Sequence, residues 1–346
     1  MIVLDNLVYN LQRAGGISTY WYELSSRLIR DEMDVRFIQS QKENHNIAQR
    51  SLNIDPGLLI PGKWPSNIIN RFKPVKLSDF NDPFIFHSSY NRITSNKKAV
   101  HTVTVHDFIH EKFYNGPRRF LHSYQKTQAI NKAAKIIAVS NNTKKDLIEF
   151  YPNVDPANIH VIYNGVGDDF FIINKAENTK PYLVYVGSRE GYKNFNFTVQ
   201  LMKELKDFEL YIVGKPLIKD ELKLLEDNIK GKYRFFSNAD NSQLNNIYNN
   251  AFALLYPSSY EGFGIPLLEA MRTGLPFVAL NKSSIPEVAG NAGELLDELD
   301  IDLFKYAINK IDQNREKYIT EGLKRAAQFS WEKCYRETIE VYKKLI

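Results

Sequence analysis

The chain has 346 residues, of which 43% are hydrophobic and 25% charged, and this composition excludes disordered and collagen-like proteins. Its length exceeds what one ordinary hydrophobic core needs and predicts two α/β domains. The single cysteine, Cys334, cannot form an internal disulfide, and no Cys/His cluster has the spacing of a zinc site. We therefore expect a reducing, cytoplasmic compartment and no structural zinc.

The net charge of +5 is unevenly distributed along the chain. Residues 1–165 hold 21 Lys and Arg against 14 Asp and Glu, the remainder holds 24 against 26, and all seven histidines lie in the first half. The two halves are therefore expected to bind different ligands. Two explanations of the basic half stay open: a face that meets anionic lipid or a phosphorylated acceptor, and an ordinary solvated surface. No segment is apolar enough for a signal peptide or a membrane span, so neither secretion nor membrane spanning is expected.

Apolar, β-branched runs alternate with helical segments in the first half and predict a parallel sheet. The expected strands are residues 2–8, 35–38, 84–87, 100–105 and 135–139. Residues 168–179 are polar and lack periodicity, so the interdomain linker is expected there.

The alternating pattern starts again after this linker and predicts a second open α/β sheet. Its expected strands are residues 182–187, 209–214, 233–236, 252–256 and 276–280. Residues 301–346 are predicted to be helical throughout, with Ser330 as the N-cap of the last helix. In open α/β sheets, ligands bind beyond the carboxyl ends of the strands, so functional residues are expected after the strands.

Two short motifs follow strands of the first half. Gly15 and Gly16 precede a helix expected over residues 17–30, where backbone amides favour an anion, although a glycine turn without a ligand is equally common. His106 and Asp107 follow the strand at residues 100–105. A lone histidine is more often structural than catalytic, but its place at a strand end favours function.

A basic loop follows the first strand of the second half. Gly187 ends this strand, and Arg189 and Lys193 lie four residues apart in the loop. A planar guanidinium and a compact ammonium together suit a diphosphate. A solvated basic surface is the alternative, and the position after a buried strand favours function.

The most specific segment is residues 258–271, Ser-Ser-Tyr-Glu-Gly-Phe-Gly-Ile-Pro-Leu-Leu-Glu-Ala-Met. Glu261 lies in a glycine-rich turn, and a helix is expected from Ile265, with Pro266 in its first turn. The carboxylates of Glu261 and Glu269 suit hydroxyls of a sugar and a ribose, while the helix N-terminus suits phosphate. Glu269 could instead only offset the helix dipole.

This segment resembles the Glu-x7-Glu signature of the family 4 retaining glycosyltransferases of GT-B fold. Other segments match that family in the same order: residues 15–18, 105–107, 138–144, 161–166, 186–189 and 329–333. The resemblance implies two Rossmann-like α/β domains that face each other across a cleft. The N-terminal acceptor domain would span residues 1–167 and the C-terminal nucleotide-sugar domain residues 168–328, while a final helix, residues 329–346, would cross back to the N-terminal domain.

The resemblance also implies roles for individual residues. Arg189 and Lys193 would bind the donor diphosphate, Glu269 the ribose, Glu261 a hydroxyl of the transferred sugar, and His106 the donor sugar near the reaction centre. His106, Arg189, Lys193 and Glu261 are thus the expected catalytic residues. The expected donor-binding residues are Gly15, Gly16, Gly187, Arg189, Lys193, Asn238, Glu261, Gly262, Phe263, Gly264, Ile265 and Glu269.

One segment departs from the family pattern. Many members have a glycine shortly after the strand expected at residues 233–236, whereas this chain has Ser237 and Asn238. Backbone of residues 237–239 would face the nucleobase, so the departure falls on the loop expected to bind the base.

The expected activity is retaining transfer of a sugar from a nucleotide diphosphate to a saccharide or lipid-linked saccharide, in cell-surface polysaccharide synthesis. No metal ion is expected, because no Asp-x-Asp pair ends a strand and the cations can stabilise the leaving group. No cofactor and no nucleic acid partner are expected either. The similarity of residues 186–195 to mannosyltransferase-like members implies a GDP-linked, mannose-type donor. A GT-B epimerase or phosphorylase and an inert nucleotide-sugar-binding subunit are the alternatives.

Two segments combine apolar side chains with cations, as interfacial segments do: residues 63–76 and residues 110–119. Each predicts either peripheral membrane contact or an acceptor-binding loop. The expected location is the cytoplasm, either free or in peripheral contact with the inner face of the membrane.

Overall fold

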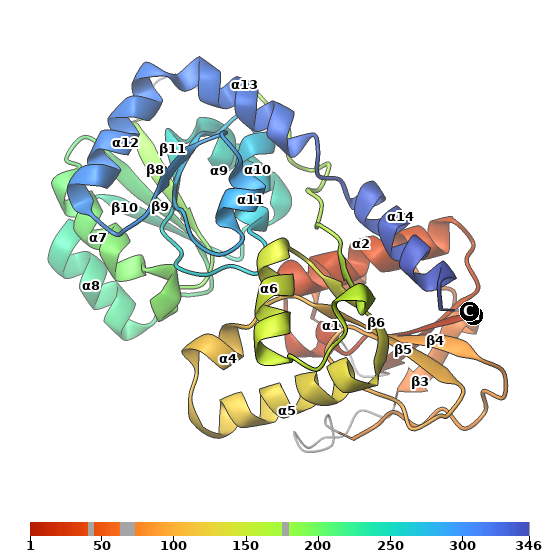
Figure 1. The fold of residues 1–346 in the computed structure, drawn as a ribbon. Coiled ribbons are helices and arrows are strands. Elements are labelled where there is room, and N and C mark those ends of the chain that lie inside the picture. Colours follow the sequence, from red (N-terminus) through yellow and green to blue (C-terminus); the bar gives the residue numbers. More distant parts are fainter. Residues whose placement is uncertain (41–44, 63–72, 175–179, 346) are drawn as a thin grey trace. The chain divides into compact units, whose positions relative to one another are not determined.

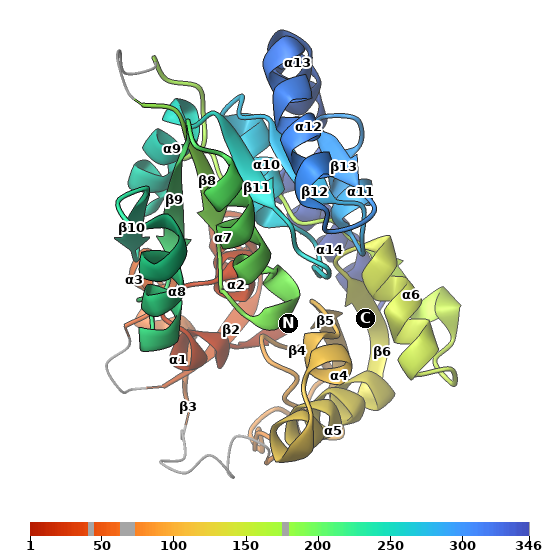
Figure 2. The ribbon, with the colours of Figure 1, turned by 90° about the vertical axis from the view of Figure 1, so that its left-hand side faces the viewer.

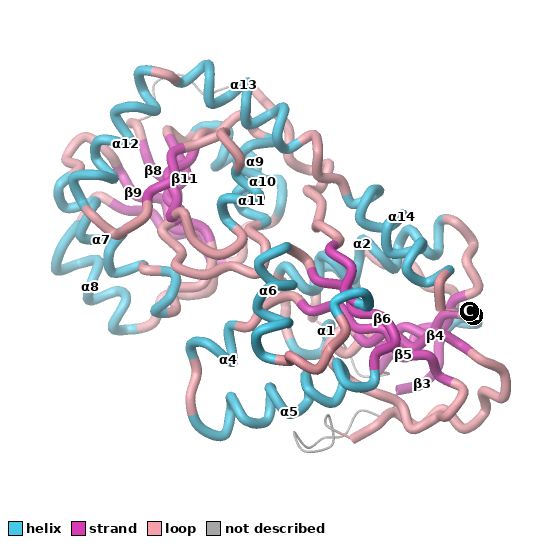
Figure 3. Tube along the Cα trace, in the orientation of Figure 1, coloured by secondary structure: helices cyan, strands magenta, loops and turns pink. Residues whose placement is uncertain are grey.

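The computed structural model describes residues 1–40, 45–62, 73–174 and 180–345 of the chain. These residues form two compact units: Met1–Asn164 with Trp331–Ile346, and Gly165–Ser330. Each unit has one parallel sheet with helices on both faces (Figures 1 and 3). The predicted fold class, α/β with two Rossmann-like domains, is therefore confirmed, and the cleft expected between the domains stays a prediction.

The first unit contains a seven-stranded sheet in the order β3-β2-β1-β4-β5-β6-β7. Its strands are β1 (Ile2–Asp5), β2 (Val35–Ser40), β3 (Leu59–Gly62), β4 (Phe84–Ser88), β5 (Ala99–Val105), β6 (Ala133–Ala138) and β7 (Ile159–Val161). Its helices are α1 (Val8–Leu11), α2 (Gly16–Arg30), α3 (Ile47–Arg50), η1 (Pro56–Leu58), α4 (Ile109–Phe113), α5 (Gly116–Lys132), α6 (Asn141–Phe150), η3 (Pro156–Asn158) and α14 (Trp331–Lys343).

The first strand is shorter than predicted. Residues 2–8 were expected to be one strand, but β1 ends at Asp5 and Val8 begins helix α1. A short apolar run does not by itself distinguish a strand from a buried helix. Strands β3, β7 and β13 were not predicted; they have three or four residues and lie at the sheet edges.

The second unit contains a six-stranded sheet in the order β10-β9-β8-β11-β12-β13. Its strands are β8 (Tyr182–Val186), β9 (Glu209–Gly214), β10 (Tyr233–Ser237), β11 (Ala253–Tyr256), β12 (Phe277–Leu280) and β13 (Glu294–Leu296). Its helices are η4 (Gly191–Lys193), α7 (Phe195–Glu204), α8 (Lys219–Ile229), α9 (Asn241–Asn250), α10 (Ile265–Arg272), α11 (Ile285–Ala289), α12 (Ile301–Gln313) and α13 (Arg315–Ala326).

One face of this second sheet is covered by α7, α8 and α12, of which α7 and α8 lie side by side (Figure 2). Apolar side chains of these helices, such as Val199, Leu225 and Phe304, form one buried cluster with the sheet residues Leu183 and Leu255. Fully burying such a side chain contributes about 1.5–3 kcal/mol. This core fixes the strand ends from which the loops of the candidate site emerge.

The C-terminal region is largely helical, as was predicted for residues 301–346, and the last helix begins at Trp331, directly after Ser330. It consists of α12, α13 and α14, and Ser330 before α14 forms a β-bridge with Val166. Helix α14 packs beside α2 within the first unit (Figure 1). An ion-pair contact from Arg27 Nε to Glu332, at 3.3 Å, joins the two helices.

The expected linker also has fixed contacts. The backbone N–H of Phe171 donates to Asn245 Oδ1 at 3.1 Å, and that of Ile173 donates to Asn249 Oδ1 at 2.8 Å. Both asparagines are buried on α9. This part of the predicted linker is therefore held on the surface of the second unit.

The strand order locates the crevice of each sheet. In the second unit the chain runs outward from β8 to β10 and then returns to β11 beside β8, and in the first unit it likewise returns to β4 beside β1. Ligands of doubly wound sheets bind beyond the carboxyl ends of the strands at this reversal. Ligands are thus expected at the loops after β8 and β11 and at those after β1 and β4.

Candidate active site

The loops after β8 and β11 bring two predicted residues into contact. The Lys193 ammonium forms an ion pair with the Glu261 carboxylate, and both side chains are largely buried. The aromatic rings of Tyr192 and Tyr256 lie 5.5 Å and 5.7 Å from Lys193 Nζ. The crevice of the second unit therefore holds a cation and a carboxylate that are fixed by each other and by aromatic neighbours.

Asn194 joins these two loops. Its backbone has a φ of 52°, a left-handed conformation that asparagine tolerates better than most residues. Its side-chain amide donates to the Pro257 carbonyl and to Ser259 Oγ, each at 2.7 Å, and the Ser259 N–H donates to the Tyr192 carbonyl at 2.8 Å. The position of Lys193 is thus determined by hydrogen bonds of the residue that follows it.

Helix α10 begins as predicted, at Ile265. Gly264 precedes it with a φ of 110°, a left-handed conformation that favours glycine, and Pro266 lies in the first turn. Gly264 has no side chain that could accept from the first amides of the helix, so these amides suit an anionic ligand. The turn before the helix is held by Ser284, whose hydroxyl contacts the carbonyl oxygens of Glu261 at 3.0 Å and Phe263 at 2.8 Å.

Arg189 is held by neighbours within the protein. Its guanidinium lies 2.9 Å from the Glu221 carboxylate and donates to the carbonyls of Lys215 at 2.7 Å and Pro216 at 3.0 Å. Only 3% of the side chain is exposed, and the Phe235 ring lies 5.8 Å away. One nitrogen, Nη1, is buried without a hydrogen-bond partner among the described residues. Arg189 therefore joins the loops after β8 and β9, and its contact with a diphosphate stays a prediction.

Glycine is required where these two loops approach each other. A Cβ atom on Gly214 would lie 2.5 Å from the Gly187 carbonyl oxygen and 3.1 Å from Arg189 Nη1, and Gly187 itself has a φ of 127°. Asn238 after β10 has a φ of 55°, and its N–H donates to the Gly214 carbonyl at 3.3 Å. Asn238 thus adopts the left-handed conformation that glycine favours, which gives a physical account of the departure noted in the sequence.

Glu269 on α10 pairs with a buried tyrosine. Tyr248 Oη donates to Glu269 Oε2 at 3.0 Å. Burial raises the pKa of Glu269 to about 7, while the hydrogen bond from Tyr248 acts in the opposite direction. A carboxylate that is already partly desolvated and oriented suits ribose hydroxyls, and this role stays a prediction.

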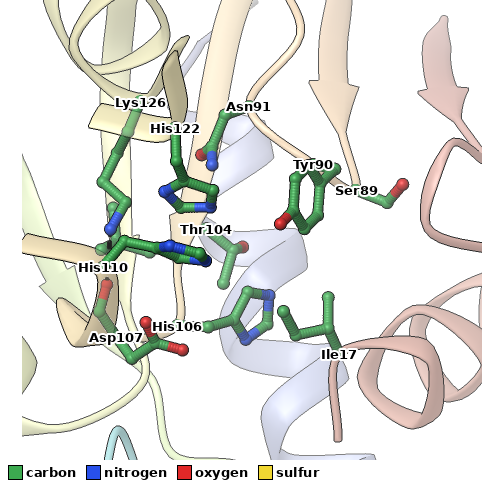
Figure 4. A pocket seen from close by; sticks show the side chains of 11 residues that line it. Ile17, Ser89, Tyr90, Asn91, Thr104, His106, Asp107, His110, His122 and Lys126 are labelled. Carbon is green, nitrogen blue, oxygen red and sulfur yellow. Dashed lines mark hydrogen bonds between the residues drawn. The ribbon is translucent and has the colours of Figure 1, made fainter. Parts of the chain in front are cut away.

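The predicted residues of the first unit lie near the ends of β1 and β5. Gly15 and Gly16 are at the start of α2, and a Cβ atom on Gly15 would lie 2.7 Å from Oε1 of Gln12. The His106 ring lies edge-on to Tyr20, with ring centroids 5.1 Å apart. Burial lowers the pKa of His106 to about 4, so its ring is uncharged near neutral pH. It lines a pocket of this unit that also holds Asp107, His110 and His122 (Figure 4).

A buried hydrogen-bonded chain supports this end of the sheet. His87 on β4 contacts Tyr342 Oη through Nδ1 at 2.6 Å and Thr104 Oγ1 through Nε2 at 3.1 Å, and Thr104 contacts Tyr20 Oη at 3.0 Å. Burial lowers the pKa of His87 to about 3. Because Tyr342 lies on α14, the C-terminal helix takes part in fixing the surroundings of His106.

Comparison with known proteins identifies the family. A model of Glycosyltransferase Family 4 matches residues 14–170, and a model of Glycosyl transferases group 1 matches residues 168–328. The chain belongs to glycosyltransferase family 4. Of its curated relatives, O-antigen chain mannosyltransferase B of Escherichia coli is 30% identical over 239 residues, which cover 63% of this glycosyltransferase and 62% of that protein. The chain thus matches about three fifths of the length of the curated relatives.

Solved structures share the fold over the whole chain. A sucrose-phosphate synthase from Thermosynechococcus elongatus is 17% identical, with a TM-score of 0.77 and coverage of 99% of this chain and 98% of that one. Anabaena Alr3699/HepE in complex with UDP and glucose is 14% identical, with a TM-score of 0.75 and coverage of 99% of both chains. These likenesses support the GT-B fold of the glycosyltransferase.

The structure distributes the predicted donor-binding residues over both units. In the second unit, the loops after β8, β10 and β11 and the start of α10 carry Gly187, Arg189, Lys193, Asn238, Glu261, Gly262, Phe263, Gly264, Ile265 and Glu269. Sequence reasoning missed four supporting residues: Asn194, Gly214, Glu221 and Tyr248. The signal that could have revealed Gly214 is the repeated Val-Gly at the ends of two neighbouring strands.

In residues 1–40, 45–62, 73–174 and 180–345, no three His, Cys, Asp or Glu side chains are grouped so that they could hold a metal ion. None of the helices in those ranges is both long and apolar enough to span a membrane.

Proposed function

We propose that this glycosyltransferase transfers a sugar from a nucleotide diphosphate to a hydroxyl of a saccharide or lipid-linked saccharide, with retention of the anomeric configuration. The observation that carries the proposal is the ion pair of Lys193 and Glu261 in the crevice between β8 and β11, beside the start of α10. A crevice of this kind offers positive potential to a diphosphate and a carboxylate to sugar hydroxyls.

Donor binding would rearrange this ion pair. The diphosphate accepts from Lys193 and from the first amides of α10, near Gly264 and Ile265, and Glu261 is then released to accept from a hydroxyl of the sugar. Arg189 supplies a further cation nearby, and Glu269 accepts from the ribose. Residues 237–239 face the nucleobase, with Asn238 holding the required backbone conformation.

The transfer step needs stabilisation of the leaving group above all. The acceptor oxygen forms a bond to the anomeric carbon as the bond from that carbon to the diphosphate oxygen breaks. The acceptor proton passes to this leaving oxygen on the same face of the sugar, so the configuration is retained. The positive groups around the diphosphate take the place of a divalent cation. His106 contacts the donor sugar, and Gly15 and Gly16 contact its phosphates.

A GDP-linked, mannose-type donor is the proposed substrate, because the name of the Escherichia coli relative is O-antigen chain mannosyltransferase B. The UDP and glucose bound by Anabaena HepE favour UDP-glucose as the second candidate. A thermal-shift screen of GDP, UDP, ADP and TDP separates the two. A ligand at about 100 times its dissociation constant stabilises a protein by about 2.7 kcal/mol, and we expect GDP to give the largest shift. The absence of a shift with all four nucleotides would contradict the proposal.

The assay for transfer also tests the alternatives. An epimerase would convert the nucleotide sugar without an acceptor, a phosphorylase would need inorganic phosphate, and an inert subunit would bind the donor without turnover. Proton NMR of the first product from an α-linked donor is expected to show an α-linkage, and a β-linkage would rule out retention. Activity is expected to persist in excess EDTA, and its loss with recovery on addition of magnesium or manganese would show that a metal stabilises the leaving group.

We further propose that the enzyme works in the cytoplasm at the inner face of the membrane, where lipid-linked acceptors for surface polysaccharide are found. Residues 63–72 of the first predicted contact segment lie outside the described residues. The second segment, residues 110–119, includes Phe113, which is 43% exposed, and the following Phe120 is 69% exposed. Such aromatic side chains beside the cations of a basic half suit an anionic lipid surface.

Vesicle flotation tests this contact. The protein is expected to float with vesicles that contain phosphatidylglycerol and less with pure phosphatidylcholine. Phe120→Ser should reduce flotation, whereas Tyr306→Ser, which changes a side chain that is 67% exposed on α12, should not. Equal flotation of the two variants would argue against contact through α5.

A further inference from the structure

A lysine of helix α5 is bonded to the loop that carries His106 and Asp107. This loop joins β5 to α4, and the Lys126 side chain extends toward Asp107 (Figure 4). The Lys126 ammonium donates to the Asp107 carbonyl and to the Glu111 carboxylate, each at 2.8 Å. One side chain of α5 therefore holds both the loop and the helix that follows it.

Lys126 and Glu111 form a buried ion pair. Only 4% of the Lys126 side chain and 5% of the Glu111 side chain are exposed. The Phe108 ring lies 4.5 Å from the ammonium, and the Ser123 hydroxyl donates to the Glu111 carboxylate at 2.9 Å. The charge of the lysine is therefore compensated within the protein and is not offered to a ligand.

Stability alone does not account for this ion pair. Taking two charges out of water is costly, and well-packed apolar side chains in their place often give equal or greater stability. Apolar contacts already hold the start of α4, since the buried Phe108 ring stacks on Phe150 of α6 at a centroid distance of 5.1 Å. What the ammonium adds is a directed hydrogen bond to the Asp107 carbonyl, which an apolar side chain cannot make.

The loop is also fixed on both sides of this carbonyl. Asp107 Oδ1 accepts from the N–H of Ile109 at 3.0 Å, in a turn that starts α4. Before the loop, Val105 is buried at the end of β5, and the His106 ring lies edge-on to Tyr20. Together with the bond from Lys126, these contacts fix the backbone from which the His106 side chain projects.

The ammonium also acts on His106 through its charge. Burial lowers the pKa of His106 to about 4, Asp107 acts in the opposite direction, and Lys126 lowers the pKa further. The other titratable groups beside this ring are His87 on β4 and Tyr20 on α2. Lys126 thus favours the uncharged imidazole in addition to holding its loop.

We propose that Lys126 is a positioning residue for the transfer reaction, which acts through His106 by its hydrogen bond to the Asp107 carbonyl. The inference rests on the proposed function, in which His106 contacts the donor sugar. Such a residue affects the rate of the reaction, because misplacement of a reacting group by about 1 Å can lower turnover about 100-fold. Affinity for the nucleotide is left unchanged, since the residues proposed to bind the base and the ribose belong to the second unit.

Hydrolysis of GDP-mannose and of UDP-glucose tests the proposal. Water takes the place of the acceptor in this assay, and the release of nucleoside diphosphate is measured. Lys126→Met removes the ammonium and keeps a long side chain, so kcat should fall about tenfold or more while KM stays within about twofold. The double variant Lys126→Met/Glu111→Gln leaves no buried unpaired charge, so it guards against misfolding and should show the same loss of kcat.

Lys132→Met is the matched control, because Lys132 lies on the same helix and its ammonium donates to the Thr94 carbonyl, in the loop before β5. This variant should hydrolyse the donor like the unchanged protein. A double-mutant cycle separates positioning from a general loss of structure: in the His106→Ala protein, Lys126→Met should lower kcat by less than about twofold. The proposal is overturned by effects that multiply, by an unchanged kcat in both Lys126 variants, by an equal loss in Lys132→Met, or by an unchanged kcat in His106→Ala.

Hydrogen exchange distinguishes this failure from a failure of the proposed function. If the unchanged protein hydrolyses neither donor, the proposed function fails, but the Ile109 N–H, which is bonded to Asp107 Oδ1, still reports on the loop. We expect this amide to exchange at least about tenfold faster in Lys126→Met/Glu111→Gln than in Lys132→Met. Equal exchange in the two variants overturns the positioning role of Lys126, whatever the rate of hydrolysis.

Discussion

The two units share one strand plan but place different chemistry at the carboxyl ends of their strands. In the second unit, the crevice holds charged groups that are compensated in pairs, Lys193 with Glu261 and Arg189 with Glu221. In the first unit, the corresponding edge holds histidines such as His106, whose pKa is lowered to about 4 by burial.

Under the proposed function, this difference would allow one fold to bind two kinds of ligand. A buried charge costs less when it is paired than when it is alone, and we propose that these pairs re-form with a diphosphate when it binds. Uncharged imidazoles do not attract an anion but donate to and accept from hydroxyls. The fold fixes where the loops converge, and the side chains on those loops decide which ligand binds.

The largest expected effect is on turnover, from Lys193→Ala. This change removes a charge that stabilises the leaving diphosphate, and loss of one such preorganised group typically lowers turnover about 100-fold or more. Initial rates of sugar transfer measure it, with Lys324→Ala on the exposed side of α13 as the control. Near-normal turnover of Lys193→Ala would mean that the second unit does not use its paired charges as proposed. Arg189→Ala is expected to lower turnover as well, and it also exposes Glu221 as an unpaired charge.

Gly214→Ala tests whether the close approach of the loops after β8 and β9 is required. The new methyl group would lie 2.5 Å from the Gly187 carbonyl oxygen, so the backbone must shift. Overpacking of this kind costs about 1–3 kcal/mol of the free energy of unfolding. Denaturant unfolding followed by circular dichroism measures the loss. Gly191→Ala, where a Cβ atom meets nothing within 4 Å, should leave stability almost unchanged.

Glu269→Gln is expected to weaken binding of the nucleoside diphosphate about fivefold to tenfold, because a neutral amide is a weaker acceptor than a carboxylate. The pKa of Glu269 is raised to about 7, so its proton is held more tightly in the folded than in the unfolded protein. This group therefore lowers the stability of the fold as the pH rises from about 4.5 to 7, while donor affinity should increase over pH 6–8 as the carboxylate forms.

Titration calorimetry at several pH values measures the affinity for the nucleoside diphosphate and its dependence on pH. In Glu269→Gln the pH dependence should shrink to that of the nucleotide phosphate alone. An unchanged dissociation constant at pH 8 would show that Glu269 does not bind the ribose and interacts only with the dipole of α10.

The last expected effect concerns the first unit and leaves the donor site unchanged. Tyr342→Phe removes the hydroxyl that lies 2.6 Å from His87 Nδ1 and leaves this buried nitrogen without its partner. We expect a loss of about 1–2 kcal/mol in the free energy of unfolding. Tyr306→Phe, at an exposed position of α12, serves as the control. Equal stability of the two variants would show that α14 does not support the histidine-lined edge through this contact.

The fold class could be predicted from the sequence because it rests on two local signals, the apolar runs and the helical segments between them. Apolar runs such as residues 182–187 and 209–214 contain the largely buried strands β8 and β9. The start of α10 was also predictable, since Gly264 and Pro266 restrict the backbone by themselves. The strand expected over residues 2–8 was wrong from Asn6 onward. Strand β1 and the start of the short helix α1 are both buried and largely apolar, so hydrophobicity alone does not separate them.

By itself, the sequence determined which residues have the chemistry for a donor site and that they follow strands, because residue type and local periodicity are properties of the chain. Only the tertiary structure decided which of them pair. Lys193 contacts Glu261 across 68 positions of sequence, Arg189 contacts Glu221 across 32, and Tyr342 reaches His87 across 255. Such contacts depend on strand order and helix packing, and no local pattern encodes them. The same holds for the uncharged state of His106, since burial by distant segments, rather than its neighbours in sequence, lowers its pKa.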